Sequence, residues 1–106
     1  MALTKGFENP LALSDHFTKH GARLGIADES TYLVRADNFL GRQKSPTAHE
    51  FQRPWNSDLV RYDPTTEEFG VLDKDGYIKT YYKPNPATHG FQTNGEYFEY
   101  EGSRTK

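Results

Sequence analysis

Two segments of the chain carry the side chains that could do chemistry. Residues 16–21 hold two histidines four positions apart, and residues 61–83 hold cations and hydroxyls in a region of alternating residues. Imidazoles exchange protons near neutral pH, and cations and hydroxyls bind phosphate oxygens. Cleavage of RNA without a metal needs a base, an acid and donors for the charged phosphorane. The two segments could supply all three.

His20 is the strongest candidate for the acid or the base. Gly21 ends the predicted helix directly after it and leaves the imidazole facing whatever segment lies opposite, while Lys19 supplies a positive charge beside it. The alternative is that His20 only caps the helix C-terminus, where a cation is favoured. His16, on the same stripe, is either a substrate contact or a surface histidine.

The last strand of the second segment offers two possible sites. Alternation separates one set of its side chains from the other: Ile78, Thr80 and Tyr82 against Tyr77, Lys79 and Tyr81. In one set, Thr80 could donate to a phosphate and Tyr82 could stack on a base. In the other, Lys79 and Tyr81 could do the equivalent. The sequence leaves both faces open.

Two further residues are candidates for contacts with the substrate. Arg61 could clamp a phosphate, or it could be half of a cross-strand ion pair with Glu68. His89 lies in a predicted loop that could approach the hairpin, or it could be a turn histidine.

The sequence predicts no metal centre and no cofactor. His16 and His20 have the spacing of two zinc ligands on a helix, but Phe17 stands where the zincin motif has glutamate. Two ligands do not make a zinc site. No glycine-rich phosphate loop is present, and no clustered carboxylates indicate a metal-dependent DNA nuclease.

Length and composition indicate one domain over residues 1–106. The apolar fraction is 34%, but aromatic residues make up 14%, so we expect a core built from rings. The absence of cysteine excludes disulfides and thiolate sites, and no apolar run approaches a membrane span. The net charge of -2 argues against extensive binding to duplex nucleic acid.

The first half of the chain is predicted to form two helices and a loop. Asn9 before Pro10 predicts the start of a helix over 10–20, and Asp28 predicts the start of another over 29–40. Residues 42–58 show no period and contain two prolines, so we interpret them as a long loop.

The second half is predicted to form strands, over 59–62, 68–72 and 77–83, with a short edge strand at 97–100. Gly76 suits a left-handed turn position between the second and third of these strands. The fold class is therefore α+β, with two N-terminal helices packed on a three- to four-stranded antiparallel sheet. We expect the helices to cover one face of the sheet and leave the other for a site.

The same segments resemble the C-terminal ribonuclease toxin domains of bacterial polymorphic and contact-dependent growth-inhibition systems, the broad group that includes barnase, colicin D and the RelE toxins. The resemblance covers roughly residues 11–100. Its main motifs are Asp15-His16-Phe17-x-Lys19-His20-Gly21, Arg61-Tyr62-Asp63-Pro64-x-Thr66, Phe69-Gly70-Val71, Gly76-x-Ile78-x-Thr80-Tyr81-Tyr82-Lys83-Pro84 and His89-Gly90.

The resemblance implies the roles of individual residues. A looser likeness to colicin D makes His20 the general acid or base, Lys19 a phosphate contact, Thr80 a donor to the phosphate, and Tyr82 a stacking or supporting ring. It further implies a domain delivered into neighbouring bacteria as part of a larger effector. There it would cut RNA, most simply tRNA, in the target-cell cytoplasm, and a cognate immunity protein would neutralise it.

A second hypothesis needs no catalysis. The polar, aromatic face of the hairpin could bind a protein partner, because aromatic side chains are enriched at such interfaces. The position of His20 relative to the sheet separates the two hypotheses.

Overall fold

The structure, a computed structural model, describes residues 4–103. Its elements follow in the order α1 (Pro10–His20), α2 (Glu29–Gly41), β1 (His49–Gln52), β2 (Leu59–Asp63), β3 (Glu68–Leu72), β4 (Ile78–Tyr82), α3 (Pro86–His89) and α4 (Asn94–Ser103). The predicted fold class is confirmed: two N-terminal helices pack on a four-stranded antiparallel sheet, and short C-terminal helices follow.

Both N-terminal helices begin where the sequence predicts. The Asn9 side chain accepts a hydrogen bond from the Ala12 backbone N–H at 2.8 Å, and the Asp28 side chain accepts one from the Thr31 backbone N–H at 2.8 Å. Each bond satisfies a donor that the first helical turn leaves without a partner. The predicted caps therefore fix the starts of α1 and α2.

The sheet has the order β1-β2-β3-β4, with every neighbouring pair antiparallel. The interpretation of residues 42–58 as a loop throughout is wrong, because residues 49–52 form the edge strand β1. All four residues of this strand are exposed, and a four-residue strand with a single apolar side chain gives too short an alternation for the sequence to reveal.

The opposite edge of the sheet is covered by the N-terminal segment. Phe7 forms a parallel bridge with Ile78, and the Ile78 backbone N–H donates to the Gly6 carbonyl at 2.8 Å. Gly76 has a φ of 95°, as the predicted turn before β4 requires. β4 is therefore held on both sides, by β3 and by residues 5–7.

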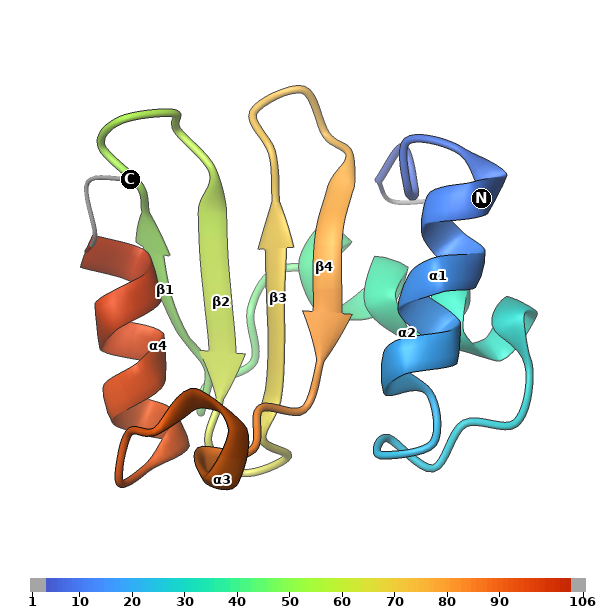
Figure 1. Ribbon diagram of the computed structural model, residues 1–106. Helices are drawn as coiled ribbons and strands as arrows, with labels where there is room; N and C mark the ends of the chain where they lie inside the picture. The colour runs from blue at the N-terminus through green and yellow to red at the C-terminus, as the bar shows by residue number, and fades with distance from the viewer. Residues whose placement is uncertain (1–3, 104–106) are drawn as a thin grey trace.

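Helices cover both faces of the sheet (Figure 1). On the rear face, Tyr32, Ala36 and Leu40 of α2 pack with Ile78 and Tyr81. On the front face, Phe98 of α4 packs against the sheet residues Val60, Tyr62, Phe69 and Val71. Rings are the largest fully buried side chains of the core, among them Tyr32, Tyr81 and Phe69, and each contributes on the order of 2–3 kcal/mol.

Two expectations about the C-terminal region are wrong. Residues 97–100 lie within α4 and not on an edge strand, and α4 covers part of the face that was expected to be left for a site. Thr93 begins this helix, because its side chain accepts a hydrogen bond from the Glu96 backbone N–H at 3.1 Å and donates to the Glu96 carboxylate. Among residues 4–103, no helix is long and apolar enough to cross a bilayer.

Candidate functional site

Helix α1 lies beside the edge of β4 and brings both of its histidines to that strand (Figure 1). His16 Nδ1 is 3.4 Å from Thr80 Oγ1. The His20 ring stacks on the Tyr82 ring with 4.7 Å between centroids, and the two imidazole centroids are 5.8 Å apart. Two imidazoles, a hydroxyl and a tyrosine from opposite halves of the chain thus share one site.

The local sequence explains why the histidines point to β4. Their i,i+4 spacing places them on the same side of α1, one turn apart. Gly21, which keeps right-handed helical angles, leaves room for the Phe17 ring, since a Cβ there would lie 2.7 Å from it. His16 is further held by the Phe7 ring, at 5.2 Å between centroids.

Partial burial makes both imidazoles easier to deprotonate. Burial lowers the pKa of His16, and the charge of Lys19 lowers it further, while Asp15 raises it. Burial also lowers the pKa of His20, as do the charges of His16 and Lys19, while Asp15 raises it. Both rings are therefore mainly neutral at pH 7, and a neutral imidazole can accept a proton.

Side chains from both alternating sets of β4 line one hollow. A bulge between Val71 and Leu72 leaves Lys79 without a partner in the β3–β4 register. Strict alternation therefore fails. Lys79, Thr80 and Tyr82 line the same hollow of about 170 Å³ between β4 and α4, whereas Tyr81 packs with α2 on the rear face.

Lys79 is held at the rim of this hollow by a buried carboxylate. Its Nζ lies 2.9 Å from Asp58 Oδ2, and Asp58 is only 2% exposed. Arg53 reaches the same carboxylate at 3.5 Å and also pairs with Glu101 of α4 at 2.8 Å. The network compensates much of the positive charge but fixes the position of the half-exposed Lys79 ammonium.

A line of rings continues from Tyr82 across the front face. The Tyr82 hydroxyl is hydrogen-bonded to the Tyr97 hydroxyl, and the Tyr97 ring stacks on His89 at 4.3 Å between centroids. His89 uses both ring nitrogens locally, because Nδ1 accepts from the Phe91 backbone N–H and Nε2 contacts Asn94 Oδ1. His89 thus supports Tyr97 at the end of the line and does not touch the α1 histidines directly.

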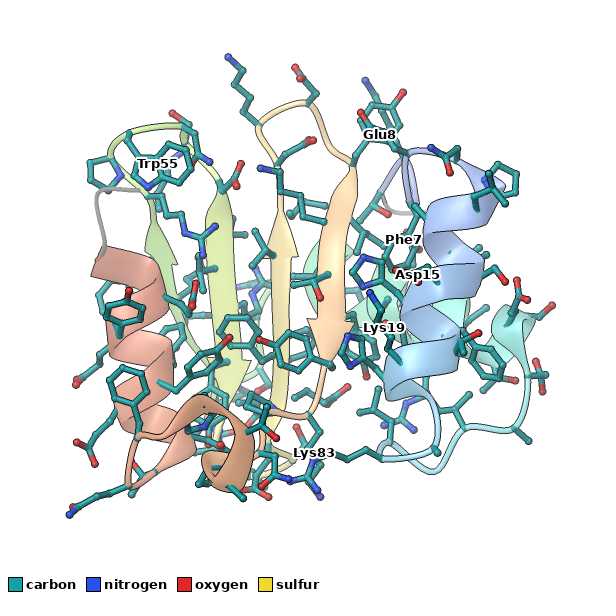
Figure 2. The ribbon with its side chains drawn as sticks, in the orientation of Figure 1. Phe7, Glu8, Asp15, Lys19, Trp55 and Lys83 are labelled. Atoms are coloured by element: carbon teal, nitrogen blue, oxygen red, sulfur yellow. The ribbon has the colours of Figure 1, made fainter. Side chains whose placement is uncertain are left out.

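Lys19 lies on α1 beside the histidines, at the surface, and does not line the hollow. Its Nζ pairs with the Asp15 carboxylate at 3.0 Å, and more than half of each side chain is exposed. Figure 2 shows both residues between α1 and β4, with Lys83 just beyond the end of the strand. The exposed Lys19 ammonium can therefore contact a bound polyanion from its position on α1.

Arg61 is not part of this site. Its guanidinium is buried on the rear side, where Nη1 donates to the Phe39 carbonyl at 2.7 Å and to the Arg42 carbonyl at 2.8 Å. Nη2 pairs with Glu50 of β1 at 2.7 Å. The interpretation of Arg61 as a phosphate clamp is not supported by this placement. The cross-strand ion pair exists, but its acid is Glu50 and not Glu68.

The sequence reasoning missed Tyr97, Arg53 and Asp58. Tyr97 had a signal, because Thr93 and Glu96 have the spacing of a capping box, which would have identified α4. Arg53 and Asp58 had none: they face each other across the turn between β1 and β2, where the Arg53 backbone N–H donates to the Asp58 carbonyl at 2.8 Å, and no periodic pattern marks this turn.

Within residues 4–103, no three histidine, cysteine, aspartate or glutamate side chains are grouped closely enough to hold a metal ion. The chain matches no known family model, and no curated protein matches it significantly. The site itself offers two paired imidazoles, a hydroxyl, a fixed ammonium and a ring-lined hollow.

Proposed function

We propose that the chain is a metal-independent endoribonuclease that cleaves RNA by attack of the ribose 2′-hydroxyl. The observation that carries the proposal is the convergence of His16 and His20 on Thr80 and Tyr82, two residues that also line the hollow containing Lys79. Proton transfer and binding of a phosphodiester are the two requirements of this chemistry.

The electrostatics of the pair suggest how the work is divided. A charge on one imidazole disfavours protonation of the other, whose ring centroid is 5.8 Å away, so the pair holds a single proton, which we assign to His16. His20 then acts as the base and His16 as the acid. Because the pKa of each ring lies below the ordinary 6.5, the free protein populates this state most at mildly acidic pH.

In the cleavage step, one imidazole accepts a proton and the other donates one. His20 takes the proton of the 2′-hydroxyl as O2′ forms a bond to phosphorus. The bond from phosphorus to O5′ breaks, and O5′ receives the proton of His16. The products are a 2′,3′-cyclic phosphate and a 5′-hydroxyl, and no water or metal is consumed.

The remaining groups hold the substrate. Thr80 Oγ1, 3.4 Å from the imidazole of His16, donates to a phosphate oxygen, and the Lys79 ammonium lies at the rim of the same hollow. Lys19 offers a second cation at the surface, and Tyr82 provides a ring beside a nucleobase. Few cations contribute, which suits a short single-stranded segment better than a long duplex.

We extend the proposal to the biological role that the sequence resemblance implies. The domain is delivered as part of a larger effector and acts on RNA, most simply tRNA, in the cytoplasm of a target cell. A cognate immunity protein then protects the producing cell. The sequence motifs that surround His20 and Thr80 support this extension.

The test is the chemistry of the product ends. RNA incubated with the protein in the presence of a chelator should be cut, leaving 2′,3′-cyclic phosphates and 5′-hydroxyls. DNA of the same sequence, and RNA with 2′-deoxy substitution at the cut site, should stay intact because they lack the nucleophile. Cleavage of DNA, or 5′-phosphate ends on RNA, would show that another reaction takes place.

A non-catalytic interaction module is the second candidate. It is favoured by the ion pairs that already engage Lys79 and Arg53, since paired charges are less available to phosphate. The front hollow would then seat a side chain of a protein partner. Intact RNA after prolonged incubation with the folded protein would support this candidate.

A further inference from the structure

The two edges of the sheet differ. Residues 5–7 and α1 cover the β4 edge, whereas β1 pairs only with β2 among the described residues. Every residue of β1 is exposed, including Phe51 at 42%. An edge strand presents main-chain donors and acceptors that another extended segment can pair with.

A hollow of about 610 Å³ lies beside this edge, between β1 and α4. It is separate from the imidazole site, with which it shares no lining residue. Rings form its apolar part: Phe51 stacks on Phe98 at 5.0 Å between centroids, and Tyr62 lies at 5.6 Å from Phe98. A strand added to β1 would direct every second side chain toward this hollow.

The charges around the hollow select the chemistry of its occupant. Glu96 and Glu99 of α4 line it, and α4 contains no lysine or arginine between residues 94 and 103. Lys44 is the one lysine of the lining, and Glu50 is already engaged by Arg61. The α4 wall therefore favours a cationic side chain and disfavours the phosphates of RNA.

A second copy of this chain fits the edge poorly. If two β1 strands paired antiparallel across a two-fold axis, the two α4 helices would meet on the same face of the joined sheet. Figure 1 shows α4 lying in front of β1, so the glutamates of one copy would approach those of the other. Like charges brought together in this way oppose association.

We propose that the β1 edge and the adjoining hollow bind an extended segment of a partner protein by strand addition. The segment carries alternating basic and apolar side chains. Main-chain hydrogen bonds to residues 49–52 supply pairing, an apolar side chain contacts Phe51 and Phe98, and a basic side chain approaches Glu96 and Glu99. The inference does not depend on the proposed nuclease activity.

The test uses a short peptide of alternating lysine and valine, with a glutamate–valine peptide for comparison. In NMR titrations of the whole chain at low salt, the lysine peptide should bind and the glutamate peptide should not. The changes in backbone chemical shift and in amide protection should be concentrated in residues 49–52. The double variant Glu96→Lys/Glu99→Lys should weaken binding by about tenfold or more. The matched variant Glu8→Lys/Glu29→Lys, which makes the same change in net charge elsewhere, should bind as the wild type does.

Two N-methylated versions of the lysine peptide test the strand geometry. Methylation of every second residue removes the donors along one edge of the peptide and keeps all side chains, so one of the two versions should fail to bind and the other should bind. Equal binding of both versions, equal binding of the glutamate peptide, or no binding of the lysine peptide at millimolar concentration would each overturn the proposal. Protection of β1 by self-association of the chain alone would also overturn it, by assigning the edge to a second copy.

Discussion

His16 and His20 form a coupled pair whose properties are set by their neighbours on α1. They lie one turn apart, and the exposed ion pair of Asp15 and Lys19 flanks them. Asp15 raises the pKa of each imidazole and Lys19 lowers it, while burial lowers the pKa of both. The helix thus places acidic and basic side chains at positions from which they tune the site without occupying it.

This arrangement predicts the direction of two opposite substitutions. Lys19→Gln should raise the pKa of both histidines and Asp15→Asn should lower both, because each substitution removes a charge that acts on the two imidazoles. The wild-type values should both lie below 6.5. NMR titration of the imidazole C–H signals measures each value. Shifts in the same direction in the two variants would contradict the proposed electrostatics.

The elements that position the site were predictable where a local signal existed. The caps Asn9 and Asp28 identify the two N-terminal helices, and period-two patterns identify β2 to β4. β1 was missed because both of its faces are exposed. The aromatic residues among acidic ones at 97–100 indicate a short edge strand, but these residues lie within the helix 94–103, whose start is marked by the capping-box spacing of Thr93 and Glu96.

Arg61 of β2 connects this strand to β1 and to the end of α2. Its removal should therefore destabilise the fold. Its guanidinium bonds Glu50 of β1 and the carbonyls at the end of α2. Arg61→Ala should lower the free energy of unfolding by about 3 kcal/mol, since the loss leaves buried acceptors without donors. Urea denaturation measures the change.

A control separates this structural role from catalysis. Lys19→Ala removes an exposed ion pair and should cost less than about 1 kcal/mol. The fraction of Arg61→Ala that remains folded should cleave RNA at the wild-type rate per molecule. A stable Arg61→Ala variant that has lost cleavage would restore Arg61 to the site.

At the scale of the whole molecule, the site exists only because distant segments meet. The sequence indicates the chemical types in residues 16–21 and 77–83, but it leaves open which face of residues 77–83 forms a site, and the contact of His20 is with Tyr82. The sequence does not indicate that His16 is the histidine next to Thr80. It also does not reveal the bulge that turns Lys79 to the same hollow, since a bulge depends on how β3 and β4 pair.

The measurement that tests the central claim most directly is RNA cleavage by matched histidine variants in the presence of a chelator. His16→Ala and His20→Ala should each lower the single-turnover rate by about a hundredfold or more, because each removes a proton-transfer group. His49→Ala, which removes an exposed imidazole on β1 away from the site, should cleave at the wild-type rate. Circular dichroism verifies that all three variants are folded. Wild-type rates in either α1 variant, or an equal loss in all three, would contradict the account.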